Sequence, residues 1–373
     1  MPAKDEINKA QPKFRDWWAA IAFLVVCGVF IWLSVLFLSA LPGDMFKSGR
    51  SASQATNFYS WPTVVMVLIF IVIGFLVSVI YLMAIQHASE FIINMSYTLV
   101  VAAMLAGAIY YLVARVWFAG ALLLAGGLLT GYLWFKYWRH YVKFTSAILK
   151  AVCRVFWKFT STLWASFVFL VVACGFSILW ALVLAGSLKY FSCETDTSSQ
   201  GVKHKVCKEG ASKVLSLIYL VFAYYWIVQV LSGVLYTTIC GVFGTHFFFP
   251  DGQYPYKNPL LSSLRRATTY SFGSVCFGSL ILAIIQTIRL MIKNMQSETS
   301  DFLCGVVLCI IQCILGGIQW LAEFITEYAY VDVALFGNSF VTASKRTNEL
   351  MESSGMRMVA NDCLVDSVLF CGG

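Results

Sequence analysis

Long apolar segments recur along this chain, and they restrict its fold more than any other feature of the sequence. A helix needs about 20 mostly apolar residues to cross the roughly 30 Å hydrocarbon core of a bilayer. The chain is 60% hydrophobic and only 12% charged, about half the charged fraction of a soluble domain. We therefore predict an all-α fold, a polytopic transmembrane helical bundle with eight complete spans. The predicted spans are residues 17–41, 62–85, 91–113, 116–135, 162–188, 214–241, 272–292 and 302–326.

The polar segments divide the chain into an N-terminal tail at 1–16, the bundle at 17–326 and a final segment at 327–373. Within the bundle, residues 136–160 carry Lys and Arg at three-, four- and seven-residue steps, which predicts a helix with one basic face. We expect this helix to lie along lipid headgroups, and we expect no nucleic acid partner, because the cations form short islands between apolar runs. The excess of Lys and Arg on one side predicts a cytoplasmic N-terminus and a cytoplasmic segment at 327–373.

Twelve cysteines are present, and most lie in apolar segments, where Cys behaves as a small hydrophobic residue. Cys193 and Cys207 differ, because both fall in the polar loop after the fifth span, on the predicted outer side. An oxidising compartment allows a disulfide between them, and two unrelated free thiols are the alternative. The four histidines are dispersed and the sequence has no CxxC pair, so we expect no metal site and no cofactor.

The few polar residues inside the spans are the candidate site residues, because each is costly unless it is paired or lines a cavity. Gln229 follows Trp226 by three residues, so both share one helical face, and aromatic faces hold quaternary ammonium groups. Glu323, near the inner end of the eighth span, would attract a cation or carry a proton; the alternative is a carboxylate that reaches interfacial water. Tyr225 and Trp320 are further candidates, with simple packing as the alternative for every ring. The familiar catalytic motifs are absent from the sequence, so we expect no enzyme.

Two stretches are much more specific than hydropathy. The first begins at Pro259, continues to Leu282 and contains the pattern R-x(3)-Y-x(2)-G-S-x(2)-F-G-S-L-I. The second runs from Glu323 to Phe340. Together they resemble the choline transporter-like family, which includes fungal and protist members, and the resemblance covers roughly residues 60–370. The motif residues of the first stretch are Arg266, Tyr270, Gly273, Ser274, Phe277, Gly278 and Ser279.

This resemblance implies ten spans, two cytoplasmic termini and facilitated movement of choline or similar organic cations. The chain ends where a ninth span would begin, so we expect a family member that is C-terminally truncated before its last two spans. We therefore predict a multi-pass transporter of the plasma membrane that moves choline or a similar organic cation by alternating access, with membrane lipids as further partners. The alternative is a membrane scaffold or modulator without transport of its own, or a channel, given the missing last spans.

Overall fold

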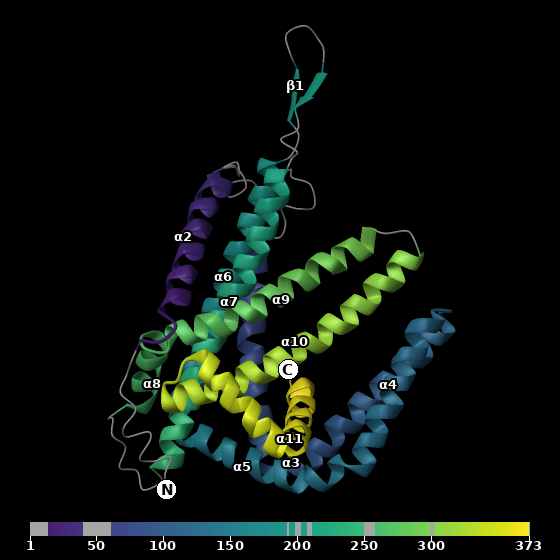
Figure 1. Cartoon of the computed structure of the whole chain (residues 1–373), viewed down its shortest axis with the longest axis vertical. Helices are drawn as coiled ribbons and strands as arrows, with labels where there is room; N and C mark the ends of the chain where they lie inside the picture. Colours follow the sequence, from purple (N-terminus) through teal and green to yellow (C-terminus); the bar gives the residue numbers. More distant parts are fainter. Residues whose placement is uncertain are drawn as a thin grey trace. The chain divides into compact units, whose positions relative to one another are not determined.

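The computed structural model describes residues 14–39, 61–191, 194–197, 203–206, 211–249, 258–298 and 302–372 (Figure 1). Helices dominate these residues, as the apolar segments predict. The chain forms two compact units, one from residues 1–57 and 164–348 and the other from residues 58–163 and 349–373.

The first unit is a helical bundle in which α7 packs against α8, α9 and α10, while α2 packs against α7 and α9. α6 joins the bundle through Trp180, whose ring nitrogen Nε1 donates a hydrogen bond of 2.9 Å to the carbonyl oxygen of Leu220 on α7. The core contains Phe23, Val275 and Tyr330 from three different helices. The helices of this unit are α2 (Trp17–Ser39), most of α6 (Thr160–Tyr190), α7 (Ala211–Phe248), α8 (Pro259–Thr268), α9 (Phe272–Glu298), α10 (Phe302–Phe336) and the first part of α11 (Phe340–Gly372).

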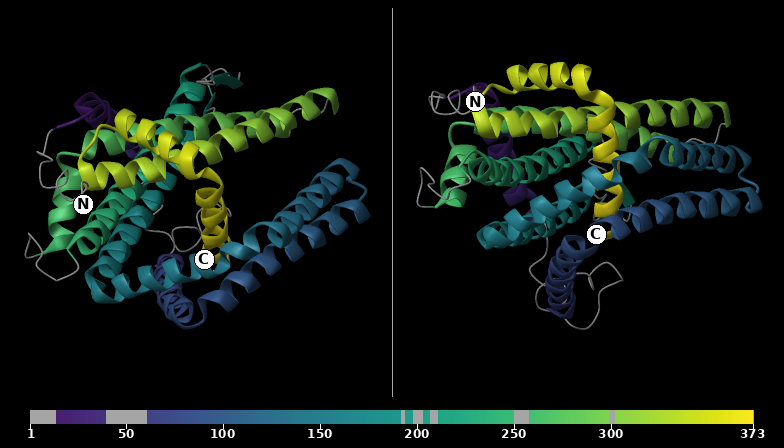
Figure 2. Two further views of the ribbon diagram at one scale, coloured as in Figure 1. Left: turned by 60° about the horizontal axis from the view of Figure 1, so that its bottom comes forward. Right: turned by 90° about the horizontal axis from the view of Figure 1, so that it is seen from below.

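The second unit is built on a long helical hairpin, in which α3 and α4 run side by side (Figure 2). A tight turn joins them at residues 114–115, between the predicted spans 91–113 and 116–135, and Arg115 adopts a φ of 62° there. The turn is closed by a hydrogen bond of 2.9 Å from the amide nitrogen of Val116 to the carbonyl oxygen of Tyr111. The elements of this unit are α3 (Trp61–Val113), α4 (Trp117–Lys136), η3 (Trp138–Tyr141), α5 (Val142–Lys158) and the last part of α11.

α5 is an amphipathic helix, as the spacing of its charges predicts. Its buried face carries Val142, Leu149 and Cys153, which belong to the core of the second unit. Its basic residues Lys143 and Arg154 are exposed on another face. The last part of α11 covers part of the same core, where the hydroxyl of Thr145 donates a hydrogen bond of 2.9 Å to Asn361 Oδ1.

Six helices in the described residues are long and apolar enough to cross a membrane, compared with eight predicted spans. One reason is that the second and third predicted spans both lie in α3, in which the non-helical residue Ala88 separates two helical segments by a kink. The other reason is that the apolar part of α4 is short, at Gly120–Lys136.

The surface of the spanning helices is apolar. Leu24, Ile31 and Phe70 each expose 62% of their surface. A soluble monomer rarely exposes large continuous apolar patches, so this surface fits a hydrocarbon environment. The structure therefore agrees with the composition in indicating a membrane protein.

A two-stranded hairpin follows α6, formed by β1 (Glu194–Thr197) and β2 (Lys203–Val206) in antiparallel register. Its first pair joins Glu194 to Val206. Cys193 and Cys207 precede and follow this pair in the sequence and lie outside the described residues, so their disulfide stays a prediction.

We expect Cys193 and Cys207 to be oxidised in the protein isolated from cells. The measurement is mass-spectrometric mapping of peptides after alkylation without reduction, with Cys309 on α10 as the internal control for a free thiol. A disulfide-linked peptide pair holding both residues supports the bridge. Full alkylation of both cysteines before reduction contradicts it.

Candidate functional site

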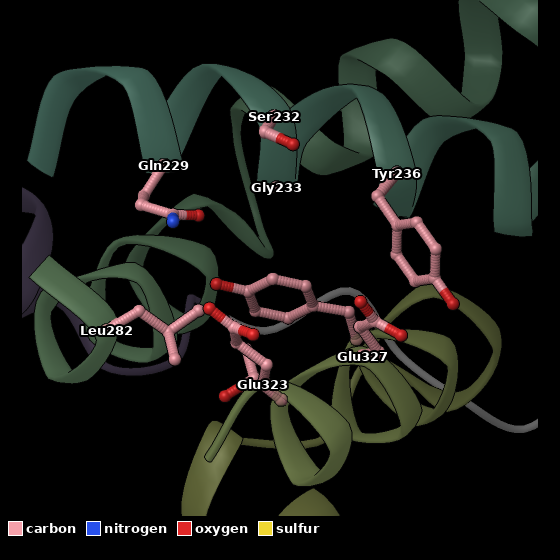
Figure 3. Close-up of a pocket in the computed structure, with 9 residues that line it drawn as sticks. Gln229, Ser232, Gly233, Tyr236, Leu282, Glu323 and Glu327 are labelled. Atoms are coloured by element: carbon pink, nitrogen blue, oxygen red, sulfur yellow. The ribbon is translucent and has the colours of Figure 1, made fainter. Parts of the chain in front are cut away.

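A pocket of about 230 Å³ lies within the first unit, between α7, α9 and α10 (Figure 3). This volume is slightly below the range of about 300–1,000 Å³ that is typical of sites for drug-sized ligands, so it suits a smaller molecule. α7 contributes four lining residues, α9 contributes one and α10 contributes four. The lining residues are Gln229, Ser232, Gly233, Tyr236, Leu282, Glu323, Thr326, Glu327 and Tyr330.

Two carboxylates give the pocket its electrostatic character. Glu323 and Glu327 lie one turn apart on α10 and both direct their side chains into the pocket (Figure 3). Glu323 is half-buried, and its Oε1 accepts a hydrogen bond of 2.8 Å from Gln319 Nε2. Among the described residues, the lining includes no Lys or Arg. The pocket therefore attracts positive charge and disfavours anions.

Two tyrosines add aromatic surface to the pocket. Tyr330 is 5% exposed, and its hydroxyl donates a hydrogen bond of 2.9 Å to the carbonyl oxygen of Val275 and accepts one of 2.9 Å from Ser279 Oγ. The ring of Tyr236 lies with its centroid 6.5 Å from that of Tyr330. Gly233, on α7 like Tyr236, lies against Tyr330, where an added Cβ would be 3.2 Å from the ring. Rings beside carboxylates are a combination that holds organic cations.

The helix that carries Glu323 is longer than the predicted eighth span. The eighth span was predicted to end at Thr326, but α10 continues to Phe336, so Glu323 lies in the middle of the apolar segment Val307–Phe336. The helix continues because Tyr330 and Val333 are buried against the rest of the unit. The helix that carries Glu323 therefore ends ten residues beyond the predicted end of the span.

The structure brings together two of the five residues predicted to bind substrate, Gln229 and Glu323. Trp226 is 2% exposed and does not line the pocket; its Nε1 donates a hydrogen bond of 3.1 Å to the carbonyl oxygen of Cys276. Tyr225 packs beside Tyr224 at a centroid distance of 5.9 Å, away from the lining. Trp320 is 44% exposed and lies against Phe324, also outside the pocket.

Sequence reasoning missed Tyr236, Thr326, Glu327 and Tyr330 as pocket residues. A signal for three of them was present, because residues 323, 326, 327 and 330 are spaced by three or four and therefore share one helical face. Tyr236 lies seven residues after Gln229, which also places both on one face of α7. Apolar residues separate these positions in the sequence, so the overall composition of each segment does not indicate a polar face.

The motif residues on α9 contact the residues at the start of α2. Asp16 Oδ2 accepts a hydrogen bond of 2.7 Å from Ser274 Oγ and one of 2.9 Å from the amide nitrogen of Phe340. Phe340 begins α11, and the first amide groups of a helix have no acceptor within it. Asp16 therefore ties α2, α9 and α11 together.

Aromatic contacts and close backbone packing complete this junction. Tyr270 lies beside Phe14, and Phe277 lies beside Trp18, each with ring centroids 4.9 Å apart. A Cβ at position 273 would overlap the main-chain carbonyls of Arg15 and Asp16, which only glycine avoids.

The other motif residues pack close to the junction and the pocket. Gly278 lies against the side chains of Tyr330 and Phe340, and Ser279 bonds the Tyr330 hydroxyl. Arg266 accepts a hydrogen bond of 3.1 Å from the amide nitrogen of Ser271 through its carbonyl oxygen. Most of the motif therefore supports the helices around the pocket and does not line it.

Long helices with apolar surfaces and a polar pocket between three of them define a multi-pass membrane protein. The sequence profile of the family described as plasma-membrane choline transporter matches residues 121–373. The protein named Protein PNS1 of Debaryomyces hansenii is 31% identical over 368 residues, which cover 96% of this chain and 70% of that protein. Protein PNS1 of Candida albicans is 31% identical over 381 residues, with 98% of this chain and 71% of the relative covered. The chain belongs to the choline transporter-like family.

Proposed function

We propose that this protein is a membrane transporter for choline or a similar small organic cation, and that the pocket between α7, α9 and α10 is its binding site. The observation that carries the proposal is the lining, which combines Glu323 and Glu327 with the rings of Tyr236 and Tyr330. Such a lining suits a quaternary ammonium group, whose charge is spread over methyl groups. The group contacts aromatic faces by cation–π attraction and needs no hydrogen-bond acceptor.

The uncharged end of the ligand also finds partners in this pocket. Gln229 is half-buried and reaches the pocket from the side opposite α10 (Figure 3). Its amide offers both a donor and an acceptor, which matches the hydroxyl of choline. In this arrangement the ammonium lies by the carboxylates and tyrosines, and the hydroxyl lies by Gln229.

Transport requires the pocket to open alternately to the two sides of the membrane. Its three helices meet through close contacts at small residues, among them Gly233 on α7 and Gly278 on α9. Close contacts of this kind allow small shifts of one helix against another. The proposal places the protein in the plasma membrane with a cytoplasmic N-terminus and assigns it a carrier function without catalysis.

The test is uptake of radiolabelled choline by proteoliposomes that contain the full chain. We expect saturable uptake, with KM raised about ten-fold in Glu323→Gln and Glu327→Gln, because each variant removes one charge from the pocket. Glu349→Gln, an exposed residue on α11 outside the pocket, is the matched control and should leave KM unchanged. Equal KM values in all four proteins would remove the pocket from the transport route.

A second candidate function is that of a membrane scaffold or modulator, favoured by α5. Its exposed Lys143 and Arg154 suit anionic lipid headgroups, while its opposite face is buried in the second unit. The uptake assay separates the two functions. Saturable uptake by the wild-type chain supports the carrier, and its absence from correctly inserted protein favours the scaffold.

A further inference from the structure

A chain of polar side chains connects the pocket with a charged residue that does not line it. Arg289 on α9 donates a hydrogen bond of 2.7 Å from Nη1 to Gln319 Oε1 on α10. Gln319 in turn donates the 2.8 Å hydrogen bond from Nε2 to Glu323 Oε1. The sequence does not indicate a joint role for these residues, because Arg289 and Glu323 are 34 positions apart on different helices.

The direction of each hydrogen bond between Arg289, Gln319 and Glu323 follows from which groups can donate and which can accept. A guanidinium only donates and an ionised carboxylate only accepts, so the amide of Gln319 must turn its oxygen to Arg289 and its nitrogen to Glu323. Without Arg289, the Gln319 side chain keeps its hydrogen bond to Glu323 but loses the donor on α9 that holds its amide oxygen in place. In the reversed orientation its oxygen would face a carboxylate oxygen, which is repulsive.

Arg289 is itself held in place from α10. Gln312 Nε2 donates a hydrogen bond of 2.8 Å to the main-chain carbonyl oxygen of Arg289, and Gln312 Oε1 lies 3.4 Å from Arg289 Nε. Gly316 lies next to the guanidinium, where an added Cβ would be 3.5 Å from Nη2. Gln312, Gly316, Gln319 and Glu323 follow each other at four-, three- and four-residue steps, so they form one face of α10.

We propose that Arg289 is a positioning residue, which orients Glu323 for the substrate cation through the side chain of Gln319. This inference rests on the proposed function and adds a residue outside the pocket that determines its selectivity for cations. Glu323 keeps one oxygen bound to Gln319 and presents the other to the ligand. Arg289 thus acts on binding without touching the ligand.

The experiment is a double-mutant cycle on choline uptake in proteoliposomes, with Arg289→Gln, Gln319→Leu and the combination of both. Each single variant should raise KM about ten-fold with little change in kcat; that factor corresponds to about 1.4 kcal/mol. The double variant should also raise KM about ten-fold, since Arg289 and Gln319 act through the same series of hydrogen bonds. Independent residues would raise KM about a hundred-fold. Arg289→Lys, which keeps a donor and the charge, should restore part of the affinity.

A neutral isostere of choline, 3,3-dimethyl-1-butanol, separates positioning from general disruption. Its inhibition constant should change less than two-fold in the same variants, because it has no charge for Glu323 to attract. Additive effects in the cycle, or equal losses for choline and the isostere, would overturn the inference while leaving the proposed function intact. Absence of saturable uptake by the wild-type protein would remove both. Size-exclusion profiles of all variants identify any protein that does not fold, and Arg289→Lys then carries the test.

Discussion

Gly273→Val is expected to prevent the assembly of the first unit. A Cβ at this position overlaps the main-chain carbonyls of Arg15 and Asp16, and main-chain atoms cannot turn away as the end of a side chain can. The start of α2 must therefore move off α9. This movement also breaks the hydrogen bonds that Asp16 accepts from Ser274 and from the Phe340 amide. We expect a loss of about 3 kcal/mol or more, at the upper end of overpacking effects.

The measurement is the thermal stability and the size-exclusion profile of detergent-solubilised protein. Gly317→Val is the matched control, because Gly317 lies on α10 with no atom within 4 Å of an added Cβ. It should leave both readouts unchanged or slightly improved, since valine has a higher helix propensity than glycine. Equal stability of the two variants would show that residues 14–18 do not need close contact with α9.

The helices of this protein were predictable because hydropathy acts locally. Every predicted span overlaps a helix, although the second and third both lie in α3, and the hairpin turn at Arg115 falls where a charged residue interrupts two apolar runs. The ends of the helices were less predictable. α10 extends past Thr326 because Tyr330 and Val333 pack into the core, which no window of sequence reveals. By contrast, the non-helical kink at Ala88 lies between the predicted spans 62–85 and 91–113, where the sequence places a break.

The candidate site was predictable in part, and the reason is the cost of polar groups inside a membrane. Gln229 and Glu323 were chosen on that ground, and both line the pocket. Trp226 was chosen for its position on the face of Gln229, but its ring is buried between helices and its nitrogen bonds the Cys276 carbonyl. The same face of α7 contacts both the core, through Trp226, and the pocket, through Gln229. Sequence periodicity alone cannot separate the two.

The function of the motif on α9 depends on contacts between residues far apart in the chain. Ser274 and Asp16 are 258 positions apart, and Phe340 and Asp16 are 324 positions apart. The sequence indicated that this stretch is specific to a family, but it did not indicate that Gly273 packs against the residues at the start of α2. The close approach at Gly273 became visible only once the helices were placed.

Glu323→Lys is expected to lower the affinity for choline by more than a hundred-fold. Glu323 is half-buried in a pocket whose described lining contains no Lys or Arg. The substitution replaces the attraction between the carboxylate and the substrate cation by a repulsion between two cations. Two unit charges about 4 Å apart interact by about 4 kcal/mol at the effective dielectric constant of a protein surface, and about 2.8 kcal/mol is already a hundred-fold. The lysine can also occupy the place of the substrate cation and lie by Glu327 and the rings of Tyr236 and Tyr330.

Competition binding of choline to purified protein measures this effect without the need for transport. Glu349→Lys makes the same charge change on the exposed surface of α11 and should change the dissociation constant less than two-fold. Glu323→Gln should fall between the wild type and Glu323→Lys, because it removes the attraction without adding a repulsion. That order follows from the charge at position 323 alone. A Glu323→Lys protein that folds and binds choline within three-fold of the wild type would contradict a role for this carboxylate in cation binding.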